Sequence, residues 1–113
     1  MHELGIAQEI IRIVHDEADR KKLPRITAVA LRIGALAGVD PEALRFGFEA
    51  SVMATSLEGT QLLIEWLPVK GKCRACGLEF TVDDLVFFCP ACQSPDIELT
   101  QGEELSIDHL VIE

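Results

Sequence analysis

Four cysteines in two identically spaced pairs are the residues of this sequence best suited to metal chemistry. The pairs are Cys73-Arg-Ala-Cys76 and Cys89-Pro-Ala-Cys92, and residues 77–88 separate them. A two-residue gap lets a tight turn direct both sulfurs to one point, and two such turns facing each other complete a tetrahedral thiolate shell. The spacing therefore predicts a four-cysteine zinc site, with iron in a rubredoxin-type site as the competing reading.

Other uses of the cysteines fit the sequence less well. Disulfides conflict with a cytoplasmic location, which we expect because the start of the chain lacks the basic, apolar and small-residue segments of a secretory signal. A thioredoxin-like redox site needs only one cysteine pair. Since four cysteines fill a tetrahedral shell and leave no position for a substrate, the predicted metal is structural rather than hydrolytic.

The first three residues, Met1, His2 and Glu3, could form a second metal site of a different kind. The α-amine, the amide nitrogen of His2 and its ring nitrogen can form adjoining chelate rings, and Glu3 adds an amide nitrogen and a carboxylate. Deprotonated amide nitrogens bind metals that favour square-planar nitrogen coordination, chiefly nickel and copper. Many histidines at a second position have no such role, so these residue types alone leave the site open. The two other histidines, His15 and His109, are better explained as a core-edge residue and a packing residue.

Composition excludes several classes of protein. The chain of 113 residues has 10 basic and 19 acidic residues, a net charge of −9, which disfavours a nucleic-acid partner. Its uncharged apolar stretches fall short of the ~20 residues that span a bilayer, so we expect a soluble protein with no membrane partner. The sequence offers no interpretable nucleophile and base, phosphate loop or open catalytic metal site, which predicts a protein that is not an enzyme.

Helical periodicity and capping signals predict two helices. Apolar residues recur at steps of three and four over residues 4–21, at Leu4, Ala7, Ile11, Val14 and Ala18. The segment Asp40-Pro41-Glu42 supplies an N-cap, a proline at the first helical position and an early acid for a second helix. That helix should direct Leu44, Phe48 and Val52 inward.

Strand patterns surround the cysteine block. Residues 26–39 predict a strand that runs into a turn, residues 61–69 a strand with Pro68 at its exit, and residues 104–113 a final strand. The cysteines thus lie in an insertion between two strands, framed by Gly71 and Gly102. Between the cysteine pairs, a small hairpin around the metal should use the apolar residues Leu78, Phe80, Val82, Leu85, Phe87 and Phe88.

Several motifs together resemble the HypA/HybF family of hydrogenase nickel-incorporation proteins from end to end. They are the opening Met1-His2-Glu3-Leu4-Gly5-Ile6-Ala7, the CxxCG and CPxC motifs, the Ser94–Glu98 stretch and the closing Gly102–Ile107 segment. The resemblance implies an α+β fold with two helices packed on a small three-stranded mixed sheet and an inserted zinc-ribbon-like lobe. It also implies a nickel-binding lobe of residues 1–69 plus 103–113 and a zinc-binding lobe of residues 70–102.

The function implied by this resemblance is that of a nickel metallochaperone. Met1 would contribute its amine, His2 its ring and amide nitrogens, and Glu3 a supporting contact to the transported nickel. The structural zinc would be held by Cys73, Cys76, Cys89 and Cys92. The implied partners are a HypB-type GTPase and the [NiFe]-hydrogenase large subunit, with urease maturation proteins in some relatives. A zinc-ribbon interaction module and a rubredoxin-like iron electron carrier are the competing readings.

Overall fold

The computed structural model describes residues 2–113, so the predicted nickel ligand Met1 lies outside the described residues. The chain divides into two compact units. The helical unit comprises the chain up to Arg32, Val39–Glu65 and Ser106–Glu113, and the cysteine unit comprises Ile33–Gly38 and Trp66–Leu105. Over residues 2–113, no helix is both long enough and apolar enough to cross a membrane.

Two amphipathic helices, α1 (His2–Lys21) and α2 (Pro41–Ser51), pack on each other in the helical unit. The α1 helix starts earlier than predicted, at His2, and it buries Ala7, Ile10 and Val14. Of the predicted apolar stripe, Ala7 and Val14 are buried and Ile11 is half-buried, while Ile10, outside that stripe, is buried. Leu4 is 41% exposed because it lies at the margin of the contact with α2, beside Gly47, which has no side chain to cover it.

The start of α2 follows its sequence signals. The Asp40 carboxylate accepts hydrogen bonds from the N–H groups of Glu42 (3.0 Å) and Ala43 (3.3 Å), and Pro41 is the first helical residue. Such a cap satisfies N–H groups that have no partner within the helix. The predicted inward side chains of α2 are confirmed as buried: Leu44, Phe48 and Val52.

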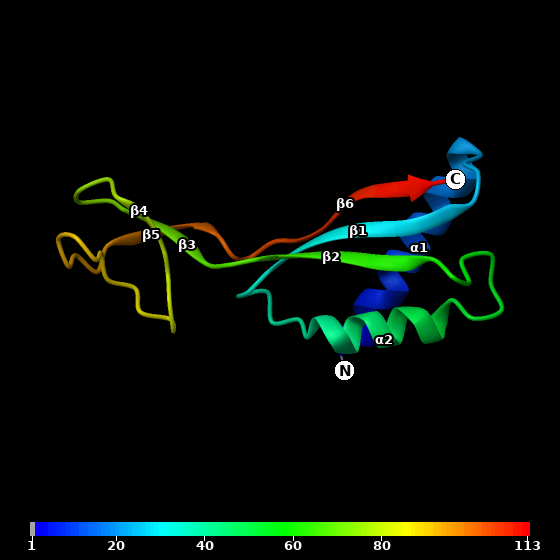
Figure 1. Ribbon diagram of the computed structural model, residues 1–113, viewed down its shortest axis with the longest axis horizontal. Coiled ribbons are helices and arrows are strands. Elements are labelled where there is room, and N and C mark those ends of the chain that lie inside the picture. The colour runs from blue at the N-terminus through cyan, green and yellow to red at the C-terminus, as the bar shows by residue number, and fades with distance from the viewer. Residues whose placement is uncertain (1) are drawn as a thin grey trace. The chain divides into compact units, whose positions relative to one another are not determined.

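Three strands, β1 (Ile26–Gly34), β2 (Gln61–Leu67) and β6 (Leu105–Ile112), form one sheet in the order β2-β1-β6 (Figure 1). The Thr60 hydroxyl donates to the Ile26 carbonyl, and the Ala35 N–H donates to the Leu67 carbonyl, so β1 and β2 run parallel. Parallel neighbours need a crossover connection, which α2 provides. The Glu113 N–H donates to the Arg25 carbonyl and the Gly34 N–H to the Glu104 carbonyl, which makes β6 antiparallel to β1. The predicted mixed sheet is confirmed.

A second sheet organises the cysteine unit. Its strands are β3 (Lys70–Cys73), β4 (Glu79–Thr81) and β5 (Ile97–Gln101), in the order β4-β3-β5 with antiparallel pairing throughout. Gly71 pairs with Phe80 on one side and Leu99 on the other. A Cβ at Gly71 would come 2.6 Å from Cγ2 of Ile97, so glycine is required for the strands to approach.

The segment between the cysteine pairs differs from the predicted hairpin. Only its first part, β4, forms a strand, and β4 pairs with β3 rather than with the residues that follow it. Of the six apolar residues predicted to build the hairpin, Val82 is the one fully buried, while Leu85 and Phe88 are 64% and 56% exposed. Because β4 pairs with β3, residues 83–88 form a loop and not the second strand of a hairpin.

Candidate metal sites

The structure brings the four cysteine sulfurs together. Cys73 is the last residue of β3, and Cys76 lies in the turn that follows this strand. Cys89 and Cys92 lie further along the chain, beyond β4, at the start and end of a second turn. The Sγ atoms of Cys73 and Cys92 are 3.5 Å apart, as are those of Cys76 and Cys89, and all four lie within 4.8 Å of one another. A Zn–S bond of ~2.3 Å in a tetrahedron separates neighbouring sulfurs by about 3.8 Å. The four thiols therefore have the spacing of a tetrahedral metal site.

The two cysteine turns repeat the same backbone hydrogen bonds. The Gly77 N–H donates to the Cys73 carbonyl and the Gln93 N–H to the Cys89 carbonyl, both at 2.8 Å. The closing residue of each turn has a positive φ, +82° at Gly77 and +64° at Gln93. Glycine adopts this conformation freely, whereas glutamine does so at a cost. The second turn is thus the more strained of two equivalent turns.

Backbone N–H groups point at the first sulfur of each pair. The Cys76 N–H lies 3.4 Å from Cys73 Sγ, and the N–H groups of Ala91 and Cys92 lie 3.4 Å and 3.5 Å from Cys89 Sγ. The Cys92 N–H, with that of Ala91, lowers the pKa of Cys89 to about 6 against the opposing effect of burial. The Cys76 N–H in the same way lowers the pKa of Cys73. These donors favour the thiolate, the form that binds a metal.

The second cysteine of each pair has the opposite tendency. The Leu78 N–H acts to lower the pKa of Cys76, but the hydrogen bond with Cys89 and burial outweigh it and raise that pKa to about 12. The Ser94 N–H likewise opposes the bond with Cys73 and the burial that together raise the pKa of Cys92. Each close sulfur pair therefore combines one thiol whose pKa is lowered with one whose pKa is raised. A bound dication would favour the thiolate form of all four cysteines.

The described part of the predicted nickel site lies in the first turn of α1. Nε2 of His2 is 3.3 Å from Oε2 of Glu3, and the His2 side chain is 60% exposed while that of Glu3 is 13% exposed. Oε2 of Glu3 also accepts the N–H of Asp40 at 3.2 Å. This bond is the main cause of the lowered pKa of Glu3. The Glu3 carboxylate thus links the start of α1 to the cap of α2, a contact that the sequence pattern did not reveal.

Neither of the other histidines joins a ligand cluster. His15 pairs with Asp19 at 3.6 Å and His109 with Asp108 at 2.7 Å, and both rings are more than half exposed. The prediction of His109 as a packing residue is therefore wrong. Over residues 2–113, the four cysteines form the one group of three or more histidine, cysteine or acidic side chains close enough to share an ion.

Known proteins match the chain over its whole length. The family model described as "Hydrogenase/urease nickel incorporation, metallochaperone, hypA" matches residues 1–112. A hydrogenase maturation factor HypA of Desulfitobacterium hafniense is 40% identical over 113 residues, covering 100% of this chain and 99% of that protein. One from Geobacter metallireducens is 42% identical and covers 100% of both chains. One from Chloroflexus aurantiacus is 44% identical over 108 residues and covers 95% of both.

Solved structures share the fold. A solution structure of a HypA protein superposes with a TM-score of 0.74 at 23% identity, covering 100% of this chain and 97% of that one. The solution structure of the Ni metallochaperone HypA from Helicobacter pylori gives a TM-score of 0.64 at 22% identity, with 97% and 96% coverage. Together with the four-cysteine site, the sequence matches show that this chain belongs to the HypA family of hydrogenase and urease nickel-incorporation metallochaperones.

Proposed function

We propose that this protein binds Ni(II) at its N-terminus and delivers it during maturation of [NiFe]-hydrogenase, while its four cysteines hold a structural zinc. The observation that carries the nickel part is the exposed His2 ring beside the Glu3 carboxylate at the first turn of α1. The ligands would be the Met1 amine, the ring and amide nitrogens of His2, and a supporting contact from Glu3.

Helix geometry supports a chelate that uses backbone nitrogens. The N–H groups of the first four residues of a helix have no carbonyl partner within it. Deprotonating the amide of His2 or Glu3 would therefore break no hydrogen bond between backbone groups of α1. Deprotonating an amide in the middle of the helix would break one. Because amine, imidazole and amide must all lose protons, nickel affinity should fall as the pH drops through the histidine range.

Zinc suits the cysteine site because its donor set and spacing match a closed tetrahedral shell. When bound, zinc would contribute folding energy to a unit whose loop leaves much of its apolar surface exposed. The N–H groups directed at Cys73 and Cys89 would stabilise the charge on two of the four thiolates. Iron in the same shell would give a coloured protein, so colourless protein that contains zinc excludes the rubredoxin-like alternative.

The division of roles follows the chain. Residues 1–69 plus 103–113 would carry nickel, and residues 70–102 would hold zinc and help to orient partners. A HypB-type GTPase and the [NiFe]-hydrogenase large subunit are the proposed partners in the cytoplasm, with urease maturation proteins as further recipients. The protein would act by transferring a metal ion and not by catalysing a reaction.

Nickel titration of the zinc-loaded protein tests this function. The native chain is compared with a chain that carries two extra residues before Met1, and mass spectrometry measures the metal content of both. We expect one nickel per native chain and loss of that nickel on extension. His2→Ala should also abolish binding, whereas His15→Ala, a matched change of an exposed α1 histidine, should leave it unchanged. Equal binding by the native and extended chains would refute the N-terminal site.

A further inference from the structure

Solvent reaches the four cysteines unequally. Cys76 and Cys92, the second cysteine of each turn, are exposed, whereas Cys73 and Cys89 are 0% and 1% exposed. In a zinc-loaded site all four sulfurs are thiolates, so accessibility and not protonation decides which of them reacts with a dissolved oxidant. The second cysteine of each turn is therefore the one that an oxidant meets first.

Each exposed cysteine lies next to a buried cysteine of the opposite turn. The Sγ atoms of Cys76 and Cys89 are 3.5 Å apart, as are those of Cys92 and Cys73. A disulfide has an S–S distance of ~2.05 Å, so either pair would need to close by about 1.5 Å. An accessible sulfur beside a second sulfur is the arrangement in which an oxidised cysteine is converted to a disulfide. These contacts favour disulfides between the two turns.

Contacts that do not depend on a metal hold the two turns together. The Arg74 N–H donates to the Asp96 carbonyl at 3.0 Å, and the Arg74 guanidinium pairs with the Asp96 carboxylate at 2.9 Å. Cys73 is also paired with Ile97 where β3 meets β5. Asp96 and Ile97 follow the second turn along the chain, so these contacts keep the first turn beside it. The sulfurs of opposite turns therefore stay neighbours while the ligand shell changes.

We propose, on the basis of the zinc site in the proposed function, that Cys76 and Cys92 are oxidation sites for hydroperoxides and form the cross-turn disulfides Cys76–Cys89 and Cys73–Cys92. The exposed thiolate attacks a peroxide oxygen, the O–O bond breaks, and the products are a sulfenic acid and a hydroxide or alkoxide ion. The buried thiolate then attacks the sulfenic sulfur, forms the S–S bond and expels hydroxide. Each disulfide thus transfers two electrons from two sulfurs to one hydroperoxide.

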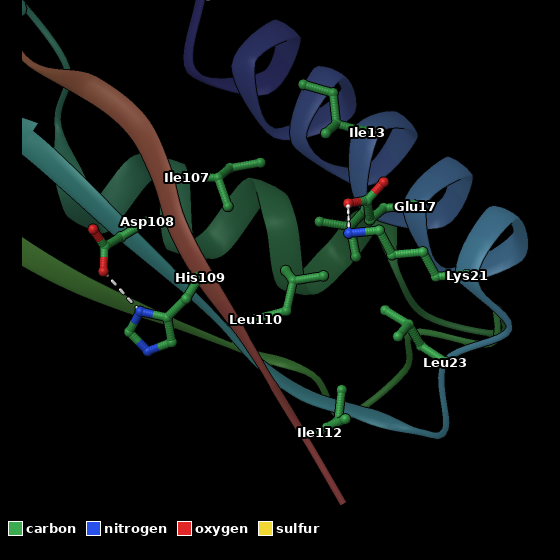
Figure 2. A pocket seen from close by; sticks show the side chains of 10 residues that line it. Ile13, Glu17, Lys21, Leu23, Ile107, Asp108, His109, Leu110 and Ile112 are labelled. Atoms are coloured by element: carbon green, nitrogen blue, oxygen red, sulfur yellow. Dashed lines mark hydrogen bonds and ion pairs between the residues drawn. The ribbon is translucent and has the colours of Figure 1, made fainter.

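The first disulfide should release the metal. A sulfur in a disulfide is no longer a thiolate, so two of the four ligands are lost. Over residues 2–113, no histidine or acidic side chain joins the cysteine cluster to replace them. His15 and His109 belong to the helical unit and are paired with aspartates, His109 with Asp108 at 2.7 Å (Figure 2). Two sulfurs do not complete a tetrahedral shell, so oxidation and zinc loss occur together.

The test adds hydrogen peroxide in increasing equivalents to the full zinc-loaded chain. A chromogenic chelator measures the zinc released, and dimedone, which traps sulfenic acids, shows by mass spectrometry which sulfur is oxidised first. We expect dimedone on Cys76 and Cys92, and zinc release in step with the first disulfide. Dithiothreitol with added zinc should restore the metal content. Dimedone on Cys73 or Cys89, or a disulfide that leaves zinc bound, would overturn the proposal.

Peptide mapping identifies the disulfides after N-ethylmaleimide has blocked the free thiols. Cleavage after Arg74 and before Asp83 places Cys73 and Cys76 on separate peptides and leaves Cys89 and Cys92 together on a third. Cross-turn disulfides join the third peptide to both others, and fragmentation of the product confirms the pairs. Disulfides within the turns join the first two peptides and leave the third separate, which would overturn the proposal.

A matched variant excludes oxidation elsewhere as the cause of zinc loss. Met53 is an oxidisable side chain of the helical unit and is 66% exposed. Met53→Leu should release zinc at the native rate, and slower release would assign the loss to methionine and overturn the proposal. Metal analysis precedes the oxidation. A chain without zinc contradicts the proposed zinc site and this proposal with it, whereas a zinc-loaded chain with other disulfides contradicts this proposal alone.

Discussion

The Glu3 carboxylate accepts the backbone N–H of Asp40 at 3.2 Å, so the second described residue of α1 holds the residue that caps α2. One acidic side chain therefore connects the starts of both helices next to the proposed nickel ligand His2. This contact explains why Glu3 is largely buried while its neighbour His2 is exposed.

Replacing Glu3 should lower stability in a graded way. Glu3→Ala removes the acceptor and leaves the Asp40 N–H without it, whereas Glu3→Gln keeps an oxygen that can accept the same bond. We expect a lower melting temperature for Glu3→Ala than for Glu3→Gln, measured by circular dichroism. Glu9→Ala, a matched removal of a carboxylate from the exposed face of α1, should have a smaller effect. Equal melting temperatures for Glu3→Ala and the native chain would show that the contact contributes nothing.

Lowering the pH should reduce the contribution of Glu3 to the stability of the fold. The Asp40 N–H and the other contacts lower its pKa from 4.5, so the carboxylate contributes stability that is present above that value and lost as the pH falls through the folded-state pKa. The stability difference between the native chain and Glu3→Gln should thus be largest near neutral pH and shrink in acid. Urea unfolding at a series of pH values measures it. A stability difference that grows in acid would show that folding raises the pKa of Glu3 and does not lower it.

The two cysteine turns should respond in opposite directions to changes of their closing residues. Gly77→Ala puts a side chain at φ +82° and should destabilise the metal-loaded cysteine unit by about 1 kcal/mol. Gln93→Gly relieves the strain at φ +64° and should stabilise it by up to about 1 kcal/mol. Competition with a zinc chelator reports both changes. Destabilisation by Gln93→Gly would mean that its side chain makes a contribution larger than the backbone strain.

Zinc binding near neutral pH should release fewer than four protons. Cys89, with its pKa lowered to about 6, is already largely ionised, while Cys76, with its pKa raised to about 12, must give up its proton to the metal. Calorimetry in buffers of different ionisation enthalpy counts the protons released. A release close to four would show that the metal-free thiols titrate as ordinary, unstructured cysteines.

Loss of one zinc ligand should affect one unit. Cys73→Ala removes a buried thiolate from the cysteine unit, whereas α1 and α2 both belong to the helical unit with its own buried core. We expect loss of zinc with far-ultraviolet helix signal largely retained. Complete loss of the helix signal would mean that the helical unit cannot fold without the metal.

Some features were determined by the sequence alone because neighbouring residues produce them. The two-residue gaps of the cysteine pairs, the Asp40 cap with Pro41, and the inward positions Leu44 and Phe48 depend on local turn geometry and helical period. All of them were predicted and are found in the fold. The family motifs at both ends of the chain added the expectation of two lobes.

Only the tertiary structure decided the contacts between distant residues. No local pattern shows that Glu3 reaches Asp40, which lies 37 positions away, or that the sulfurs of Cys73 and Cys92 come within 3.5 Å of each other. Ile10 is buried and Ile11 half-buried, a difference that depends on the surfaces against which α1 packs. The 64% exposure of Leu85 goes with the pairing of β4 to β3, a strand that precedes it by several residues, instead of to the residues that follow β4. Packing and strand order are properties of the whole chain, because each depends on surfaces that meet only after folding.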